Sequence, residues 1–130
     1  MKSAVPRVIL IALAAAALIG CTSHPIVNIK GSPTESGGKP PTLVEVERAI
    51  LRAGAAQKWQ MQTVRPGLIV GTLKWSTHVA VVDVTYTTTA YEITYKDSSN
   101  LGYDGATIHR NYNYYVQELD KGIRAQLVNL

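Results

Sequence analysis

The segment that decides the fold runs from Lys58 to Lys96 and reads KWQMQTVRPGLIVGTLKWSTHVAVVDVTYTTTAYEITYK. Apolar and polar residues alternate through much of it, which is typical of strands with one buried face. Parallel strands need crossovers of about a dozen residues or more, so the short connections here predict an antiparallel meander. The four strand-like runs are Lys58–Val64, Leu68–Trp75, His78–Thr87 and Tyr91–Lys96.

A helical pattern flanks the strands on each side. Thr42-Leu43-Val44-Glu45 has the form of a capping box, and the apolar spacing that follows predicts a helix ending near Gly54. Apolar residues at helical spacing predict a last helix over Thr107–Leu127, with Asp104 or Thr107 as its N-cap. We therefore expect an α+β fold made of a helix, a four-stranded antiparallel meander sheet and a C-terminal helix. Both helices are expected on one face of the sheet.

The first 21 residues differ from the rest of the chain. Lys2 and Arg7 precede an unbroken apolar run of 12 residues, Val8–Ile19, which is followed at once by Gly20 and Cys21. A positive start, a short apolar core and a small-residue exit are typical of a secretory signal peptide. A helix that spans a bilayer needs about 20 apolar residues, so a permanent transmembrane helix is the weaker interpretation.

The exit sequence Leu18-Ile19-Gly20-Cys21 resembles the bacterial lipobox, in which signal peptidase II cuts just before the cysteine. The resemblance implies that residues 1–20 are removed and that acyl chains such as palmitate anchor Cys21 to a membrane. Thr22 stands where the sorting pattern for inner-membrane retention has Asp, which implies the periplasmic face of a Gram-negative outer membrane. The alternative is an ordinary signal peptide with an incidental cysteine. That alternative leaves the only cysteine of the chain as a free thiol in an oxidising compartment.

Residues 21–41 are rich in Ser, Thr, Gly and Pro. This composition predicts a lipidated Cys21 followed by a flexible tether, with the folded domain over residues 42–130. A short apolar run, Ile26–Ile29, interrupts the tether. It either joins the domain as an edge strand or stays unstructured.

The chain offers little sign of catalysis or of nucleic-acid binding. Outside the signal segment, 11 Lys and Arg stand against 9 Asp and Glu, a net charge of +2 with no basic cluster. His24, His78 and His109 lack partners at metal-ligand spacing, and no nucleophile or phosphate-binding motif occurs. The loop Asp97–Gly105 lacks the spacing of a calcium loop and is better explained by turns and helix capping. We expect no metal, no cofactor and no enzymatic activity.

Two surfaces are candidates for interaction. One is a cluster at the start of the last helix, formed by His109, Tyr112, Asn113 and Tyr114. Its histidine either hydrogen-bonds the loop Asp97–Asp104, which is the simpler interpretation, or helps to bind a ligand beside Tyr95 and Tyr103. Tyr114 is expected to project to the charged side of the helix, where Arg110 could stack on its ring.

The other candidate surface is apolar. Val79 and Val81, together with Val70, are expected to point away from the buried face of the sheet, and Val44 lies off the core face of the first helix. Three alternatives would cover these apolar side chains: the segment Ile26–Ile29, a second copy of the chain, or another envelope protein.

The region before and within the last helix resembles a family of small proteobacterial lipoproteins. The resemblance is carried by Tyr95-Lys96-Asp97-Ser98-Ser99-Asn100-Leu101, by Tyr103-Asp104-Gly105 and by Ile108-His109-Arg110-Asn111-Tyr112-Asn113. It implies an envelope lipoprotein and supplies no established activity, so only the lipidated Cys21 is carried over.

These observations predict a membrane-anchored, non-enzymatic protein-interaction or envelope-accessory module. The alternative is a lipoprotein that binds a small ligand or a peptidoglycan fragment. The oligomeric state stays open.

Overall fold

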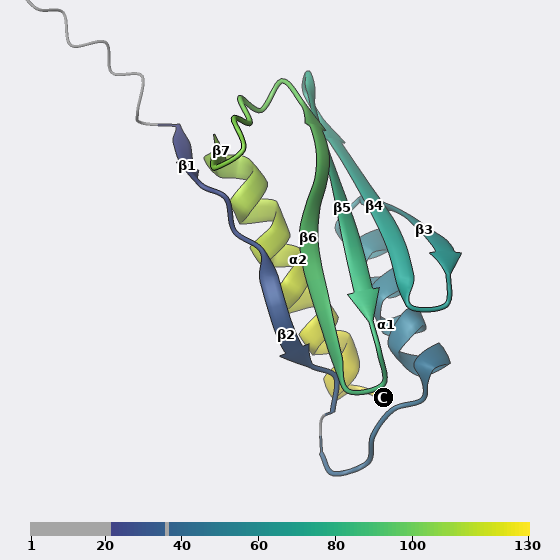
Figure 1. Cartoon of the computed structure of the whole chain (residues 1–130). Coiled ribbons are helices and arrows are strands. Elements are labelled where there is room, and N and C mark those ends of the chain that lie inside the picture. The colour runs from purple at the N-terminus through teal and green to yellow at the C-terminus, as the bar shows by residue number, and fades with distance from the viewer. Residues whose placement is uncertain (1–21, 36) are drawn as a thin grey trace, which may run out of the picture.

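The computed structural model describes residues 22–35 and 37–130 (Figure 1). The expected α+β class is confirmed: two helices lie on one face of a five-stranded antiparallel sheet. The strand order of that sheet is β2-β6-β5-β4-β3, and a separate two-stranded sheet pairs β1 with β7. The strands are β1 (Ser23–Pro25), β2 (Ile29–Pro33), β3 (Gln60–Arg65), β4 (Leu68–Trp75), β5 (His78–Tyr86), β6 (Ala90–Ser99) and β7 (Thr107–His109).

The four-stranded meander expected from the alternating pattern is present as β3 to β6, and every neighbouring pair is antiparallel. The expected strand count was too small. β2 adds to the free edge of β6, where Ile29 lies opposite Ile93 and Ser32 opposite Tyr91. β6 also extends beyond Lys96 to Ser99, so the stretch from Asp97 onward is less loop-like than its turn-forming residues suggest.

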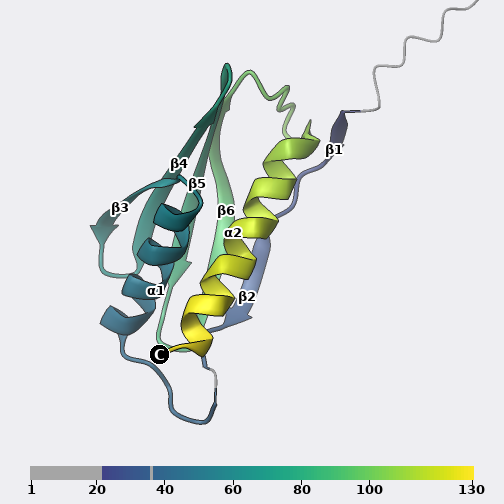
Figure 2. The same ribbon diagram turned by 180° about the vertical axis from the view of Figure 1, so that it is seen from behind.

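Both helices, α1 (Leu43–Ala56) and α2 (Arg110–Val128), cover the same face of the sheet, as Figures 1 and 2 show from opposite sides. The expected capping box is present on α1. The Thr42 hydroxyl accepts a hydrogen bond from the amide of Glu45, whose carboxylate accepts one from the amide of Thr42. In the described part of the chain, neither helix is long and apolar enough to cross a membrane.

The expected start of the last helix was wrong. Residues Thr107–His109 pair with β1 as a strand, so α2 begins only at Arg110, and its N-cap is His109. Asp104 caps the preceding turn instead, because its carboxylate accepts hydrogen bonds from the amides of Thr107 and Ala106. These bonds hold the pKa of Asp104 below its ordinary value.

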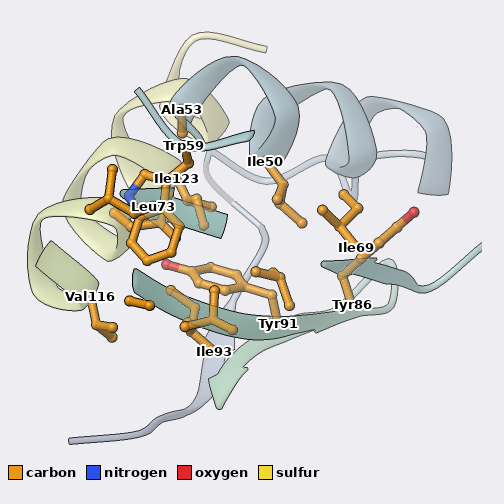
Figure 3. Packing of buried hydrophobic residues seen from close by; sticks show 14 of the residues in the cluster. Ile50, Ala53, Trp59, Ile69, Leu73, Tyr86, Tyr91, Ile93, Val116 and Ile123 are labelled. Atoms are coloured by element: carbon orange, nitrogen blue, oxygen red, sulfur yellow. The ribbon is translucent and has the colours of Figure 1, made fainter. Parts of the chain in front are cut away.

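A single hydrophobic core fills the space between the sheet and the two helices (Figure 3). The inward residues of the central strand β5 alternate with outward ones, as the period of a strand requires. Trp59, Ile69 and Tyr91 are among the buried side chains that meet Ile50 and Val116 of the helices. The packing leaves α1 and α2 fixed side by side over the sheet.

One buried polar contact joins α2 to the sheet. The Tyr91 hydroxyl donates to Asp120 Oδ1 at 2.5 Å, and Arg124 Nη2 lies 2.9 Å from Asp120 Oδ2. Burial, followed by the hydrogen bond to Asp120, raises the pKa of Tyr91 to about 12. Tyr91 and Arg124 thus supply partners to the Asp120 carboxylate, which would be costly to bury without them.

The expectation of a flexible tether over residues 21–41 needs correction. Ser23–Pro25 and Ile29–Pro33 form β1 and β2, and Ile26 and Ile29 pack against the core. The apolar run Ile26–Ile29 therefore belongs to the domain, which begins close to residue 22 and not at residue 42. Cys21, the proposed signal segment and Ser36 lie outside the described residues.

Candidate functional site

The N-terminal segment of the described chain is held along the start of α2 by backbone hydrogen bonds. The amide of Arg110 donates to the carbonyl of Thr22 at 2.7 Å, and the amide of Ile26 donates to Ala106 at 3.0 Å. Between these two bonds, β1 pairs with β7 in an antiparallel register, with Ser23 opposite His109. Thr22, the residue that follows Cys21, is thus bonded directly to the folded domain.

Asn113 fixes the same segment from the side. Its Oδ1 accepts a hydrogen bond from the amide of Val27 at 2.9 Å, and its Nδ2 donates to the carbonyl of Pro25, also at 2.9 Å. The side chain is buried, so these partners satisfy an amide that would otherwise be costly to bury. The predicted interaction residue Asn113 therefore holds β1 and the turn after it on α2.

His109 has a structural position at the same end. Its backbone amide donates to Leu101 at 2.9 Å, and its Nδ1 accepts a hydrogen bond from the amide of Asn111 at 3.1 Å. The expected contact with the loop before α2 is present, although it runs through the backbone of His109. The imidazole caps the helix, because Nδ1 takes up one of the amides that have no partner within the helix.

Aromatic rings gather around this helix start in what we call the aromatic end cluster: Trp75, His78, His109, Tyr114 and Tyr115. Trp75 bridges two elements, with its ring centre 5.3 Å from that of His78 and 4.7 Å from that of Tyr115. His78 lies 5.6 Å from His109, and Tyr114 meets Tyr115 edge-on at 5.4 Å. The cluster brings the β4–β5 turn to the same end of the domain as β1 and the start of α2 (Figures 1 and 2).

An open groove of about 720 Å³ lies between the N-terminal segment and α2. We call it the β1–α2 groove, and it is lined by His24, Pro25, Val27, Arg110, Asn111, Asn113, Tyr114 and Gln117. Arg110 is exposed, and the Tyr114 side chain is 57% exposed on the same wall. The lining contains an arginine and no acidic residue, so its charge suits an anionic group.

Tyr95, Tyr103 and Tyr112, which were expected to surround a ligand pocket, pack against one another. Tyr112 is fully buried in the core. The Tyr95 ring stacks on Tyr103 at 4.0 Å and meets the edge of Tyr112 at 5.8 Å. These rings contact one another, so they do not form the open pocket that a small ligand would need there.

The outer sheet face, which we define as the face turned away from both helices, carries Val70, Val79 and Val81. The three valines are half-buried by their neighbours in the sheet. Mixed charges flank them: Lys96 Nζ lies 3.6 Å from Asp83 Oδ1, and the strand edge carries a second pair between Lys30 and Glu92. In the described part of the chain no segment crosses this face (Figure 1), because the run Ile26–Ile29 lies at the edge of β6 and against the core.

The apolar surface expected at Val44, off the core face of α1, is small. Val44 is 54% exposed, whereas Leu51 packs against the core. Val44 therefore does not form part of a continuous apolar surface on α1.

Sequence reasoning found His109, Asn113 and Tyr114 but missed what brings them together. The β1–β7 pairing joins residues more than 80 positions apart, and no local pattern marks it. The useful signal was the apolar run Ile26–Ile29, which has no reason to occur in a flexible tether.

Among residues 22–35 and 37–130, no group of three or more His, Cys, Asp and Glu side chains could hold a metal ion. Comparison of the chain with protein-family models finds no match. Comparison with curated proteins and with solved structures finds none either.

Proposed function

We propose that this protein is a lipid-anchored, non-enzymatic protein of the bacterial envelope that acts by binding another envelope protein through its outer sheet face. The membrane anchor is the acylated Cys21, and the location is the periplasmic face of the outer membrane. Two features support the proposed anchor: the lipobox-like sequence Leu18–Cys21 and the resemblance to small proteobacterial lipoproteins.

The observation that carries the binding function is the uncovered outer sheet face. An antiparallel sheet with one face on the core often leaves the other to water, and such a face is then expected to be polar. Here Val79 and Val81 of β5 and Val70 of β4 lie on that face. Each has a polar or charged neighbour opposite it on the paired strand: Lys74, Thr72 and Asp83, respectively. Partly exposed valines mixed with polar and charged side chains, on a face that no other described segment covers, suit a protein interface of mixed character.

The outer sheet face is tested by crosslinking in living cells. A photoreactive residue at Val81 is expected to capture a discrete protein partner, while one at Arg52, exposed on the opposite side of the domain, captures none. Adding Val79→Glu to the Val81 probe should abolish the capture and leave the circular dichroism spectrum unchanged. Equal capture at both positions, or capture that survives Val79→Glu, would count against the outer sheet face.

The anchor is tested separately. A Cys21→Ser variant should leave the membrane fraction after a high-salt wash, whereas the native chain stays in it. Retention of the variant in the membrane fraction would contradict anchoring through Cys21.

The alternative function, binding of a small ligand or a peptidoglycan fragment, receives less support. The side chains expected to form its pocket, Tyr95, Tyr103 and Tyr112, occupy one another's space.

A further inference from the structure

The folded domain lies directly beside its proposed anchor, an inference that rests on the lipidation of Cys21 proposed above. The carbonyl of Thr22 is bonded to the amide of Arg110, so the residue directly after the cysteine is attached to the folded domain. Consecutive Cα atoms are about 3.8 Å apart. A flexible tether of 20 residues would instead have given an average reach of about 25 Å. Acyl chains on residue 21 would therefore start at the surface of the domain.

Several elements of the fold meet at the end of the domain that lies beside the proposed acyl chains. β1, β7 and the start of α2 share this end with the β4–β5 turn and the loop after β6 (Figures 1 and 2). His78 Nδ1 donates to the carbonyl of Asn100, and Asn100 Nδ2 donates to Thr77 Oγ1, which ties the turn and the loop together. The end is thus one bonded surface that would meet a bilayer as a unit.

That end of the domain carries aromatic side chains and a cationic one. In the aromatic end cluster Tyr114 is the exposed ring, whereas Trp75 and Tyr115 are partly buried against the core. An exposed Tyr ring favours the headgroup level of a bilayer. The β1–α2 groove opens beside it with Arg110 and Tyr114 on one helix face, and no acidic side chain lines it. Arg110 and Tyr114 are four residues apart, about 6 Å along the helix. The headgroup layer on each side of a bilayer is about 5–8 Å thick, so both side chains fit within it.

We propose that this end of the domain rests on the bilayer that holds the acyl chains and that phospholipid headgroups occupy the β1–α2 groove. Arg110 binds a headgroup phosphate, and the Tyr114 ring lies at the interface. The long axis of α2 then leads away from the membrane, and the outer sheet face is presented to the periplasm at a fixed height.

The experiment uses the full chain, exported and acylated in cells and reconstituted in vesicles of phosphatidylethanolamine and phosphatidylglycerol. Because Cys21 is the only native cysteine and is blocked by the lipid, Tyr114→Cys supplies a single thiol for a nitroxide spin label. The matched control is Val128→Cys on the same helix, 65% exposed and about 21 Å farther along its axis. Mass spectrometry verifies acylation of residue 21 in each sample.

We expect the label at position 114 to be several-fold more accessible to a lipid-soluble relaxing agent, relative to a water-soluble one, than the label at 128. Adding Arg110→Gln should reduce that difference, and added inorganic phosphate should not, because the ligand is the bilayer and not the free anion. Equal accessibility of both labels to the water-soluble agent, in protein whose acylation is verified, would overturn the proposal. Protein that carries no acyl chain on residue 21 would overturn the anchor itself, and mass spectrometry distinguishes this result from the first.

Discussion

Two fully buried tyrosines differ in what their hydroxyl groups meet. The Tyr91 hydroxyl donates to Asp120, whereas the Tyr112 hydroxyl has no hydrogen-bond partner among the described residues. A hydrogen bond to a charged group is worth about 1.5–3 kcal/mol of stability. We expect Tyr91→Phe to lower the free energy of unfolding by that amount and Tyr112→Phe to leave it nearly unchanged. Urea denaturation measures the free energy of unfolding of both variants. If Tyr112→Phe lost as much of it as Tyr91→Phe, the Tyr112 hydroxyl would have a hydrogen-bond partner.

The same residues predict how stability depends on alkaline pH. Burial raises the pKa of Tyr91 to about 12 and raises that of Tyr112 as well, from an ordinary value near 10. Since the folded state favours the neutral phenols, their contribution is fully present below pH 10 and is lost as the pH rises toward 12. Thermal unfolding between these pH values, followed together with tyrosinate absorbance, should show the loss. Tyr91→Phe should flatten the decline, and an unaltered slope would contradict this assignment.

His109 is predicted to act through helix capping. His109→Ala removes the acceptor for the Asn111 amide, and losing an N-cap costs about 1 kcal/mol. His109→Asn keeps an acceptor at the N-cap and should recover most of the loss. Chemical denaturation measures stability, and the Val81 crosslink measures function. If His109→Ala left stability intact but abolished the crosslink, His109 would belong to a binding surface.

At the level of elements, Asn113 is expected to decide whether the N-terminal segment stays on α2. Asn113→Ala leaves the amide of Val27 and the carbonyl of Pro25 without partners, at a cost of about 1–3 kcal/mol. Amide hydrogen exchange should accelerate for Ser23, His24, Ile26 and Val27 and stay slow in the central strands, because the segment can open locally. Asn111→Ala on the same helix turn is the control and should leave exchange at residues 23–27 unchanged.

The elements also show what the sequence could and could not predict. β4 and β5 are rich in apolar residues, are joined by a short turn and pair with their sequence neighbours, so the meander followed from local information. β1 and β2 contain Pro25, Gly31 and Pro33, residues that disfavour strands but are tolerated at sheet edges. Their partners lie in β7 and β6, far along the chain, so only tertiary pairing makes them strands.

The start of α2 was mispredicted for the same reason. Asp104 and Thr107 are good capping residues, and nothing local indicates that Thr107–His109 would pair with a strand more than 80 residues earlier. Tyr112, which was expected in an interaction cluster, is instead a core residue. The contact of Tyr95 with Tyr103 and Tyr112, which closed the expected pocket, depended on how the loop after β6 folds back.

For the whole molecule, the bonding of residues 22–27 to the domain changes what the proposed anchor does. A domain on a flexible tether samples many orientations. A domain that is hydrogen-bonded to the residue next to its lipid anchor would keep one end near the membrane. The opposite end of the domain holds the N-terminus of α1 and the C-terminus of α2 (Figure 2). Each helix therefore runs from one end of the domain toward the other. The outer sheet face runs between the two ends and would face sideways along the membrane, where a partner anchored in the same bilayer can reach it.

A linker inserted between Cys21 and Thr22 tests whether that fixed height matters. A flexible Gly/Ser segment of about 20 residues, begun with Thr so that a threonine still follows the cysteine, restores an average reach of about 25 Å. The β1–β7 pairing and the Asn113 contacts stay intact, so the melting temperature and the membrane fractionation should be unchanged. The nitroxide at position 114 should become accessible to water, and crosslinking from Val81 should weaken because the face no longer stays at one height. In one contrary outcome, the linker variant keeps the label at position 114 accessible to the lipid-soluble agent and keeps the full yield of the Val81 crosslink. That result would show that the domain binds the membrane by its own surface, independently of the short connection. Loss of membrane fractionation would instead mean that the linker interferes with acylation, and mass spectrometry of residue 21 separates the two results.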